Sequence, residues 1–337
     1  MKMLIIHTAF IGDIVLSTPM IAKIVEKYPG AEIYYLTVPA GVSILKNNPH
    51  ITKIISYDKK GKDRTLGAFF RLVGELRKEN FDKIYCPHRY LRSMLLTLLI
   101  GAREKIGYKT APLSCFFEKK IEYCKDIHEV KRLLTFVEGE DSQKYEIALY
   151  PGEPEELVWK TWKREIERQG YSCLVALAPG SRWETKRWPV EYFQEVLDRL
   201  SETENIAVLL LGGKEERRLS FQLRKGVWDL RGKTSLLGLA KVLQEVNYVV
   251  TNDSSPIHIA SSSPKAKIIA IFGPTVKEIG FTPWSDNSVV IELKNLACRP
   301  CSIHGTNICP QKHFRCMKEL KPELILQEIQ EYSEEEA

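Results

Sequence analysis

The chain has 337 residues, 44% hydrophobic and 27% charged, so it is long enough for two globular domains and is neither disordered nor fibrous. Its 49 Lys and Arg exceed 43 Asp and Glu by six, an excess too small to indicate nucleic-acid binding but compatible with an anionic substrate or an acidic membrane surface. No segment offers the ~18 uncharged apolar residues of a membrane span. The start of the chain is typical of a strand and not of a signal peptide, so we expect a cytoplasmic protein.

The first half alternates short apolar runs with amphipathic helical patterns. The predicted strands are Met3–His7, Glu32–Thr37, Lys53–Tyr57, Lys83–Cys86 and Lys105–Tyr108. The predicted helices are Ile14–Tyr28, Gly67–Lys78 and Leu91–Ile100. Such alternation is typical of a parallel sheet with helices on both faces.

An acidic stretch containing Pro and Gly, residues 150–156, interrupts this alternation and predicts a domain boundary. We assign residues 1–153 to an N-terminal acceptor-binding domain and residues 154–320 to a C-terminal donor-binding domain. Residues 155–169 form a connecting helix in this interpretation. Residues 321–337 contain a final helix that opens at Pro322, and we expect it to pack back on the N-terminal domain.

The second half repeats the alternation more clearly. Its predicted strands are Leu174–Leu177, Ile206–Leu211, Tyr248–Thr251, Ile268–Phe272 and Val289–Leu293. Its predicted helices are Pro189–Ser201, Glu215–Lys225, Ser235–Val246 and Pro256–Ser262. The fold class is therefore α/β, with two Rossmann-like, doubly wound domains facing a central cleft. A ligand is expected at the carboxyl ends of the strands.

The first predicted strand runs into a tight turn, Thr8 to Asp13, that opens a helix. Gly12 lets the backbone or a ligand approach closely, and we include it among the donor-binding residues. Asp13 has two interpretations. It caps the helix and stabilises its dipole, or it is a general base that takes a proton from an acceptor hydroxyl.

The loop at residues 178–189 follows the first strand of the second half and gathers hydroxyl groups and cations before a helix begins. Loops at this place bind phosphate through helix-start amides and such side chains. We predict that Lys186 holds a diphosphate as a point charge, with Ser181 and Thr185 as hydrogen-bond donors. The alternative is an exposed basic loop.

A later strand of the second half ends in another polar turn, residues 251–258. Ser254 and Ser255 precede Pro256, so a helix start presents its amide groups there. Asp253 either fixes the loop or meets sugar hydroxyls. His258 completes the predicted donor-binding set, although one turn into the helix it is better explained as a packed histidine than as a catalyst.

Several common motifs are missing from the sequence. The stretch Gly226 to Thr234 resembles a Walker loop, but five residues separate its glycines where four are needed, which argues against ATP hydrolysis. No G-x-G occurs, which argues against a dehydrogenase, and no D-x-D occurs, so a metal-bridged diphosphate lacks its usual ligands. We predict no cofactor and no catalytic metal, with the leaving group stabilised by Lys186, hydroxyls and helix amides.

Four of the eight cysteines lie together near the C-terminus, as Cys298-x2-Cys301-x7-Cys309-x6-Cys316, with His304 and His313 among them. The spacing is not that of a paired zinc ribbon. A structural metal, a disulfide and plain packed thiols all stay open. We expect no catalysis there.

In these motifs the sequence resembles the ADP-heptose:lipopolysaccharide heptosyltransferase family, glycosyltransferase family 9. The shared pieces keep their order over nearly the whole chain. They are Gly12-Asp13 with Leu16 to Pro19, Pro179-Gly180-Ser181 to Pro189, Gly232 to Leu236, Asn252-Asp253-Ser254 to His258, Phe272-Gly273-Pro274-Thr275, and Cys298-Arg-Pro-Cys301 through Cys309-Pro310 to Cys316-Met317.

The resemblance implies a GT-B fold and transfer, with inversion, of a heptose from ADP-L-glycero-β-D-manno-heptose to the inner core of lipopolysaccharide. The acceptor would be Kdo-lipid A or heptosyl-Kdo-lipid A. Asp13 stands at the family's base position and Lys186 at its phosphate-binding lysine. The loop of Asp253, Ser254 and Ser255 would contact diphosphate and sugar. Glu215 would stand near the donor ribose.

Basic residues of the first half are candidates for the acceptor's phosphates and carboxylates, although each alone is also explained as a solvated charge. They are Lys60, Arg64, His88, Arg89 and Arg92, with Lys59 and Lys62 beside them. A glycolipid acceptor implies transient contact with the inner face of the inner membrane. We expect no nucleic acid as a partner.

Three departures from the family pattern concern specificity. Ser255 replaces a usual glycine, Lys312-His313-Phe314 stands where Gly-His-His is common, and Phe10-Ile11 is less basic than in many members. The sequence leaves open which heptose is added, the first or the second, and the oligomeric state. The alternatives are a transferase or epimerase acting on another nucleotide sugar, and a non-enzymatic scaffold built on the cysteine cluster.

Overall fold

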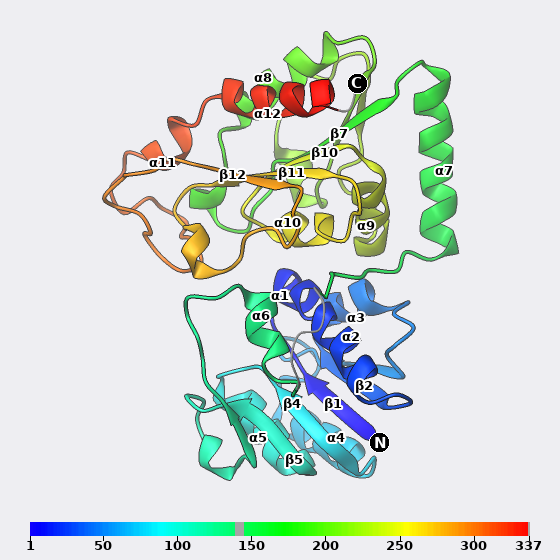
Figure 1. The fold of residues 1–337 in the computed structure, drawn as a ribbon, viewed down its shortest axis with the longest axis vertical. Coiled ribbons are helices and arrows are strands. Elements are labelled where there is room, and N and C mark those ends of the chain that lie inside the picture. The colour runs from blue at the N-terminus through cyan, green and yellow to red at the C-terminus, as the bar shows by residue number, and fades with distance from the viewer. Residues whose placement is uncertain (139–144, 336–337) are drawn as a thin grey trace. The chain divides into compact units, whose positions relative to one another are not determined.

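The computed structural model describes residues 1–138 and 145–335, which divide into two compact units, Met1–Tyr150 and Pro151–Ala337 (Figure 1). The boundary falls three residues before the end of the predicted first domain at residue 153. Each unit has its own parallel sheet and its own buried core, as the alternation of strands and helices predicts.

The sheet of the first unit has six parallel strands in the order β3-β2-β1-β4-β5-β6. The strands are β1 Lys2–Ile6, β2 Glu32–Thr37, β3 Lys53–Ser56, β4 Phe81–Cys86, β5 Ala102–Tyr108 and β6 Lys119–Ile121. The order reverses beside β1, so β1 and β4 flank the switch point where doubly wound sheets bind ligands.

The helices of the first unit are α1 Ile11–Leu16, α2 Thr18–Lys27, α3 Pro39–Leu45, α4 Leu66–Arg77, α5 Leu91–Ile100 and α6 Glu129–Leu134. In the structure, the predicted helix 14–28 begins earlier, at Ile11, and is divided at Ser17 into α1 and α2. The break has a local cause, because Pro19 stands in the first turn of α2 and the Ser17 hydroxyl donates to the carbonyl of Ile14 at 2.7 Å. Sequence patterns missed α3, α6 and β6, which are short.

The second unit repeats the topology, with six parallel strands in the order β12-β11-β10-β7-β8-β9. They are β7 Cys173–Ala178, β8 Ile206–Leu210, β9 Val227–Asp229, β10 Tyr248–Asn252, β11 Lys267–Phe272 and β12 Ser288–Glu292. Here β7 and β10 flank the switch point. These two strands are almost completely buried, as expected for strands covered on both faces.

The helices of the second unit are α7 Glu153–Arg168, α8 Val190–Ser201, α9 Leu236–Glu245, α10 Ser255–Ala260, α11 Arg315–Lys318 and α12 Pro322–Glu335. The predicted helix 215–225 is wrong beyond one short 3₁₀ turn, Glu215–Arg218. The buried guanidinium of Arg231 donates to the carbonyls of Glu216 at 2.9 Å and Leu219 at 2.6 Å. These hydrogen bonds to the Arg231 side chain replace the backbone hydrogen bonds that a longer helix would form.

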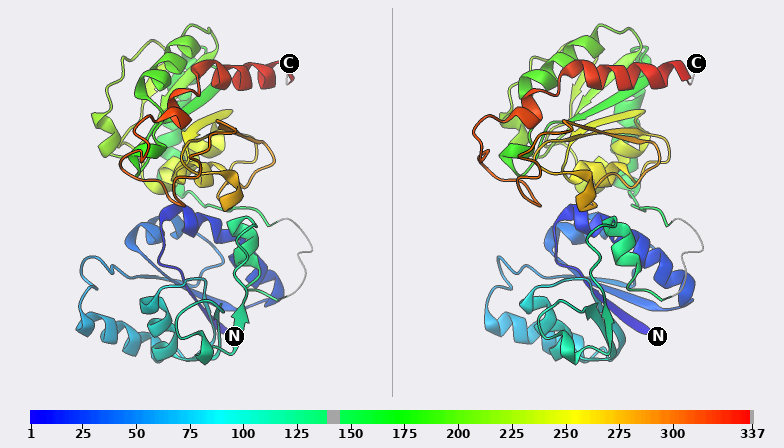
Figure 2. Two further views of the ribbon diagram at one scale, coloured as in Figure 1. Left: turned by 90° about the vertical axis from the view of Figure 1, so that its left-hand side faces the viewer. Right: turned by 60° about the vertical axis from the view of Figure 1, so that its left-hand side comes forward.

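The last helix, α12, belongs to the second unit. Its Ile325 and Ile329 lie in the core of that unit with Trp188, and Figures 1 and 2 show α12 beside α8. The predicted packing of this helix on the first domain is wrong, because its apolar face is buried in the second unit. Among the described residues, every helix is too short or too polar to cross a bilayer.

We expect Ile325→Ala to destabilise the second unit by roughly 2–4 kcal/mol, because Ile325 is 1% exposed and its truncation leaves a cavity. Leu324→Ala is the matched control, since Leu324 is 39% exposed in the same helix and its truncation should cost less than about 0.5 kcal/mol. All six Trp residues lie in the second unit, so tryptophan fluorescence during urea unfolding reports on that unit alone. Equal losses in both variants would contradict this packing.

Candidate functional site

The two loops at the switch point of the second unit are locked together by Asn252, the last residue of β10. Its side-chain oxygen accepts a hydrogen bond from the amide of Trp188 at 3.0 Å, and its side-chain nitrogen donates to the carbonyl of Pro179 at 2.7 Å. Asn252 is fully buried. The predicted phosphate loop after β7 therefore has a fixed position relative to the loop after β10.

Lys186 and Asp253 form an ion pair at this switch point, with 2.5 Å between Lys186 Nζ and Asp253 Oδ2. The Thr275 hydroxyl donates to the same carboxylate oxygen at 2.5 Å. The side chains of the pair are only 12% and 7% exposed. A nearly buried ammonium of this kind keeps donor capacity for further oxygens, as a phosphate-binding lysine requires.

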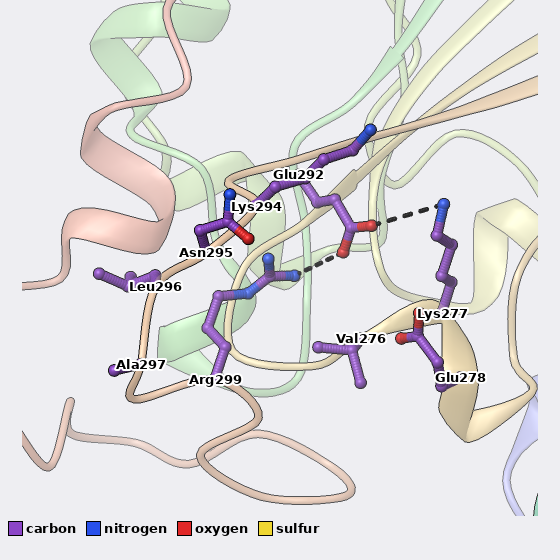
Figure 3. Close-up of a pocket in the computed structure, with 9 residues that line it drawn as sticks. All are labelled: Val276, Lys277, Glu278, Glu292, Lys294, Asn295, Leu296, Ala297 and Arg299. Atoms are coloured by element: carbon purple, nitrogen blue, oxygen red, sulfur yellow. Dashed lines mark hydrogen bonds and ion pairs between the residues drawn. The ribbon is translucent and has the colours of Figure 1, made fainter.

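Arg299 holds the loop that carries Thr275. Its guanidinium donates to the carbonyl of Thr275 at 2.7 Å and pairs with the Glu292 carboxylate at 2.9 Å. Lys277 and Arg299 both point at the carboxylate of Glu292 (Figure 3). All three residues line a cavity of about 510 Å³. None of the predicted donor residues lines this cavity. Arg299 therefore contributes to the site indirectly, through its hydrogen bond to the carbonyl of Thr275.

Two of the predicted donor-binding residues, Thr185 and Ser254, use their hydroxyl groups in structural hydrogen bonds. The Thr185 hydroxyl donates to the carbonyl of Thr306 at 2.8 Å and accepts from its amide at 2.8 Å. The Ser254 hydroxyl donates to the carbonyl of Gly180 at 3.1 Å. Thr185 thus anchors a distant segment beside Lys186, and Ser254 ties the end of β10 to the end of β7. Ser181 is buried in the same loop, and Ser255 begins α10.

The acidic residue at the strand ends is Glu216, one position after the predicted Glu215. The Glu216 carboxylate accepts a hydrogen bond from the amide of Gly213 at 2.8 Å. A methyl group added to Gly180 or Gly212 would meet the Glu216 side chain at 2.7 Å, so these glycines make room for it. Glu215 itself is exposed. The sequence carries two adjacent glutamates, and spacing alone does not choose between them.

His258 is buried within α10, where its ring lies 6.4 Å from that of Phe281 in an edge-on arrangement. This environment agrees with a packed histidine.

The clustered cysteines are all thiols in the structure. The Cys301 thiol donates to the carbonyl of Cys298 at 3.0 Å, and the sulfur of Cys298 lies 3.8 Å from His313 Nε2. Within residues 1–138 and 145–335, no group of three or more His, Cys, Asp and Glu side chains is arranged to hold a metal ion. The amide of Cys301 donates to the carbonyl of Pro274 at 2.9 Å, so this segment supports the loop of Thr275.

In the first unit, Asp13 lies in the first turn of α1, and its Oδ2 accepts a hydrogen bond from the amide of Phe10 at 3.1 Å. The capping interpretation is therefore confirmed as a structural role, and it does not exclude a second role in proton transfer. Gly12 is buried in the same turn. A chain of hydrogen bonds connects α1 to β1, because Tyr35 OH lies 2.6 Å from Ser17 Oγ and 3.2 Å from His7 Nδ1.

A buried glutamate, Glu129 of α6, lies within electrostatic reach of Asp13 and was not singled out from the sequence. Burial raises the pKa of the Glu129 carboxyl to about 7, the adjacent Arg132 opposes the rise, and the charge of Asp13 adds to it. Arg132 is 1% exposed and is ion-paired with Glu129. A carboxyl buried between strands and helices gives no local sequence signal, since its surroundings come from α1 and from the loop before α6.

The predicted acceptor residues come from the loops after β3 and β4 and, for Arg92, from the first turn of α5. Lys60, Arg64 and Arg89 are exposed, and the guanidinium of Arg89 stacks 3.7 Å from the centre of the Tyr123 ring. Arg92 is half-buried, hydrogen-bonded to Tyr57 OH and to the carbonyl of Asp63, the latter at 2.8 Å. His88 is buried at the end of β4. The structure brings the two loops together through Arg92.

Solved structures share this architecture. The family 9 glycosyltransferase of Veillonella parvula superimposes with a TM-score of 0.83 at 19% identity, over 98% of this chain and 96% of that one. The ADP-heptose lipopolysaccharide heptosyltransferase II of Escherichia coli superimposes with a TM-score of 0.80 at 20% identity, over the whole of both chains. The predicted twin-Rossmann fold is confirmed, and the fold class is that of the GT-B glycosyltransferases.

The family assignment follows from the sequence comparisons. The family described as glycosyltransferase family 9 (heptosyltransferase) matches residues 69–311, which is most of the chain. The lipooligosaccharide heptosyltransferase 2 of Campylobacter jejuni is 27% identical over 99% of both chains. The chain belongs to glycosyltransferase family 9 and is a glycosyltransferase, so the resemblance noted in the sequence is confirmed and the epimerase and scaffold alternatives are set aside.

Asp13→Asn should lower the pKa of Glu129 toward that of an ordinary glutamate, because the substitution removes a like charge that disfavours ionisation of the Glu129 carboxyl. The measurement is a ¹³C NMR titration of the carboxyl carbons in both proteins. Asp58→Asn, in the loop after β3 of the same unit, serves as the control and should leave the pKa of Glu129 unchanged. An identical Glu129 titration in wild type and Asp13→Asn would place the Asp13 carboxylate out of reach.

Proposed function

We propose that the protein transfers a heptose, with inversion, from ADP-heptose to the inner core of lipopolysaccharide, either Kdo-lipid A or heptosyl-Kdo-lipid A. Membership of the family described as heptosyltransferase supports the type of sugar. The relatives from Campylobacter jejuni and Escherichia coli are named for lipooligosaccharide and lipopolysaccharide, which supports the acceptor. The observation that carries the proposal is the buried Lys186–Asp253 pair at the switch point of the second unit.

The donor side of the mechanism uses the second unit. Lys186 holds the diphosphate and stabilises the negative charge that develops on the leaving ADP. Asp253 keeps the ammonium in place and accepts hydrogen bonds from the sugar hydroxyls. Glu216, which lies against Gly180 and Gly212, takes the place expected for an acidic residue near the ribose.

The acceptor side uses the first unit. The acceptor hydroxyl oxygen attacks the anomeric carbon of the heptose, the bond from that carbon to the diphosphate oxygen breaks, and ADP leaves with the electron pair. Asp13 takes the hydroxyl proton as the new bond forms. Lys60, Arg64, Arg89 and Arg92 bind the anionic groups of the acceptor. The reaction needs both units, because the base and the leaving-group site belong to different ones.

The place of action follows from the proposed acceptor. A lipid A acceptor is anchored in a membrane, so we infer that the enzyme works in the cytoplasm, in transient contact with the inner face of the inner membrane. The excess of basic residues is consistent with contact to an anionic leaflet.

Asp13→Asn should lower the rate of transfer from ADP-heptose by a factor of about 10²–10⁴, while the affinity for ADP stays unchanged. Asparagine keeps an oxygen to accept the hydrogen bond from Phe10, so the cap survives and only proton transfer is lost. The measurement is product formation by wild type and variant with ADP-heptose and with UDP-sugars, and calorimetry of ADP. Full turnover by Asp13→Asn would show that Asp13 only caps the helix. Wild-type activity with a UDP-sugar and none with ADP-heptose would refute ADP-heptose as the donor.

Lys186→Met should weaken ADP binding and slow transfer, each by about 10–100-fold, because one charge-assisted contact to the diphosphate is lost. Methionine keeps the apolar stem that packs against Gly305. Lys214→Met, an exposed lysine of the same unit, is the control. Calorimetry with ADP and with adenosine separates the effects, since adenosine binding should not change. Equal ADP affinity in wild type and Lys186→Met would remove Lys186 from the donor site.

A further inference from the structure

The switch point of the first unit carries a pair of buried imidazoles. His7 follows β1 directly and His88 follows β4 by two residues, and their ring centres are 5.0 Å apart. His7 is 2% exposed and His88 is 6% exposed. Because β1 and β4 flank the point where the strand order reverses, the pair stands where doubly wound sheets bind their ligands.

One ring nitrogen of this pair, His88 Nε2, has no hydrogen-bond partner among the described residues. His88 Nδ1 lies 2.9 Å from Ser93 Oγ, whereas His88 Nε2 is buried and, within the residues that the structure describes, has no hydrogen-bond partner. When the Ser93 hydroxyl donates to Nδ1, the ring proton stands on Nε2 and makes it a donor. A buried donor without a partner is destabilising, so its persistence calls for a ligand or a water molecule.

A lysine stands beside the two rings. Lys59 Nζ donates to the carbonyl of Thr8 at 2.7 Å and lies 3.3 Å from its hydroxyl. Across the described chain, no carboxylate comes within ion-pair distance of Lys59, and burial together with the charges of Lys60 and Arg92 lowers its pKa. Here a half-buried cation has cationic neighbours and needs an anion.

The two imidazoles are uncharged at neutral pH. Burial lowers the pKa of His7 to about 3 and that of His88 well below its usual value, and the charge of Lys59 lowers both further. The positive charge of this cluster therefore comes from Lys59, and His88 contributes a neutral N–H group when the Ser93 hydroxyl donates to its Nδ1. The cluster combines one ammonium with one directed donor, which suits a single oxyanion.

We propose that Lys59 and His88 form a subsite for one oxyanion of the acceptor, a carboxylate or a phosphate, with His88 Nε2 as the hydrogen-bond donor and His7 as its packing partner. This inference rests on the proposed function, since it names the part of the first unit that grips the acceptor. His7 also connects through Tyr35 and Ser17 to α1, which carries Asp13. An acceptor held there lies in the same unit as the proposed base.

The test compares two substitutions of His88. Asparagine keeps a polar group near the Nδ1 position, for Ser93, and removes the group at Nε2, whereas glutamine places an amide nitrogen near the Nε2 position. We expect His88→Asn to raise the acceptor KM about 10–100-fold with ADP affinity unchanged, and His88→Gln to recover part of the loss. His50→Asn, on an exposed loop of the same unit, is the control. Normal acceptor KM in His88→Asn would overturn the proposal.

Lys59→Gln adds a second arm. Because both side chains hold the same oxyanion, the double variant Lys59→Gln/His88→Asn should lose less than the product of the two single losses. Losses that multiply fully would place the two residues on different groups of the acceptor and would overturn the shared subsite.

A binding measurement on the wild-type protein keeps the inference separate from catalysis. Long-range ¹H–¹⁵N NMR spectra of the imidazoles report the tautomer of His88 and its response to free Kdo and to inorganic phosphate. A shift of Nε2 with Kdo identifies a carboxylate site, and a shift with phosphate identifies a phosphate site. No shift with either probe would mean that water alone satisfies Nε2. Absence of heptose transfer alongside a clear Kdo shift would refute the proposed function and leave the subsite standing.

Discussion

An ammonium withdrawn from water is stabilised by a neighbouring negative charge, and in the second unit Asp253 provides that charge for Lys186. The surrounding contacts hold the pair in place: Asn252 locks the two loops that carry it, and Thr275 donates to the same carboxylate oxygen as Lys186. Breaking such a pair would leave a buried charge, so the ion pair is held in one arrangement. A prearranged cation stabilises a leaving diphosphate without reorganisation during the reaction.

The two units share a strand order and differ in the chemistry at their switch points. In the second unit the cation is paired with a carboxylate, whereas in the first unit Lys59 stands beside two neutral imidazoles. A diphosphate carries enough charge to bind a lysine that already has a partner. An acceptor with a single carboxylate or phosphate gains more from a cation whose charge is not yet balanced. The same topology thus supports two binding tasks through different side chains.

Strand positions, the two-unit division and the loop of Lys186 were predictable because hydrophobic periodicity and strand-end loops are local signals. The contact of Glu216 with Gly180, the occupied hydroxyl of Thr185 and the burial of Glu129 were not, because each depends on residues far away in the sequence. The helix expected at 215–225 failed for the same reason, since Arg231 captures its carbonyls. Local patterns place residues at strand ends, and distant contacts decide what their side chains do.

The irregular segment that contains Cys298, Cys301 and Cys309 shows why contacts between distant residues matter. A stretch of more than about 15 residues without regular structure is uncommon in a compact domain and is usually functional. Residues 293–314 form such a stretch, and they reach both members of the ion pair. Thr306 binds the hydroxyl of Thr185 beside Lys186, and Arg299 with Cys301 holds the loop whose Thr275 binds Asp253. Since Cys316 and Met317 then enter the core of the second unit, the segment is anchored where it ends, and it connects that core to the surroundings of the Lys186–Asp253 pair.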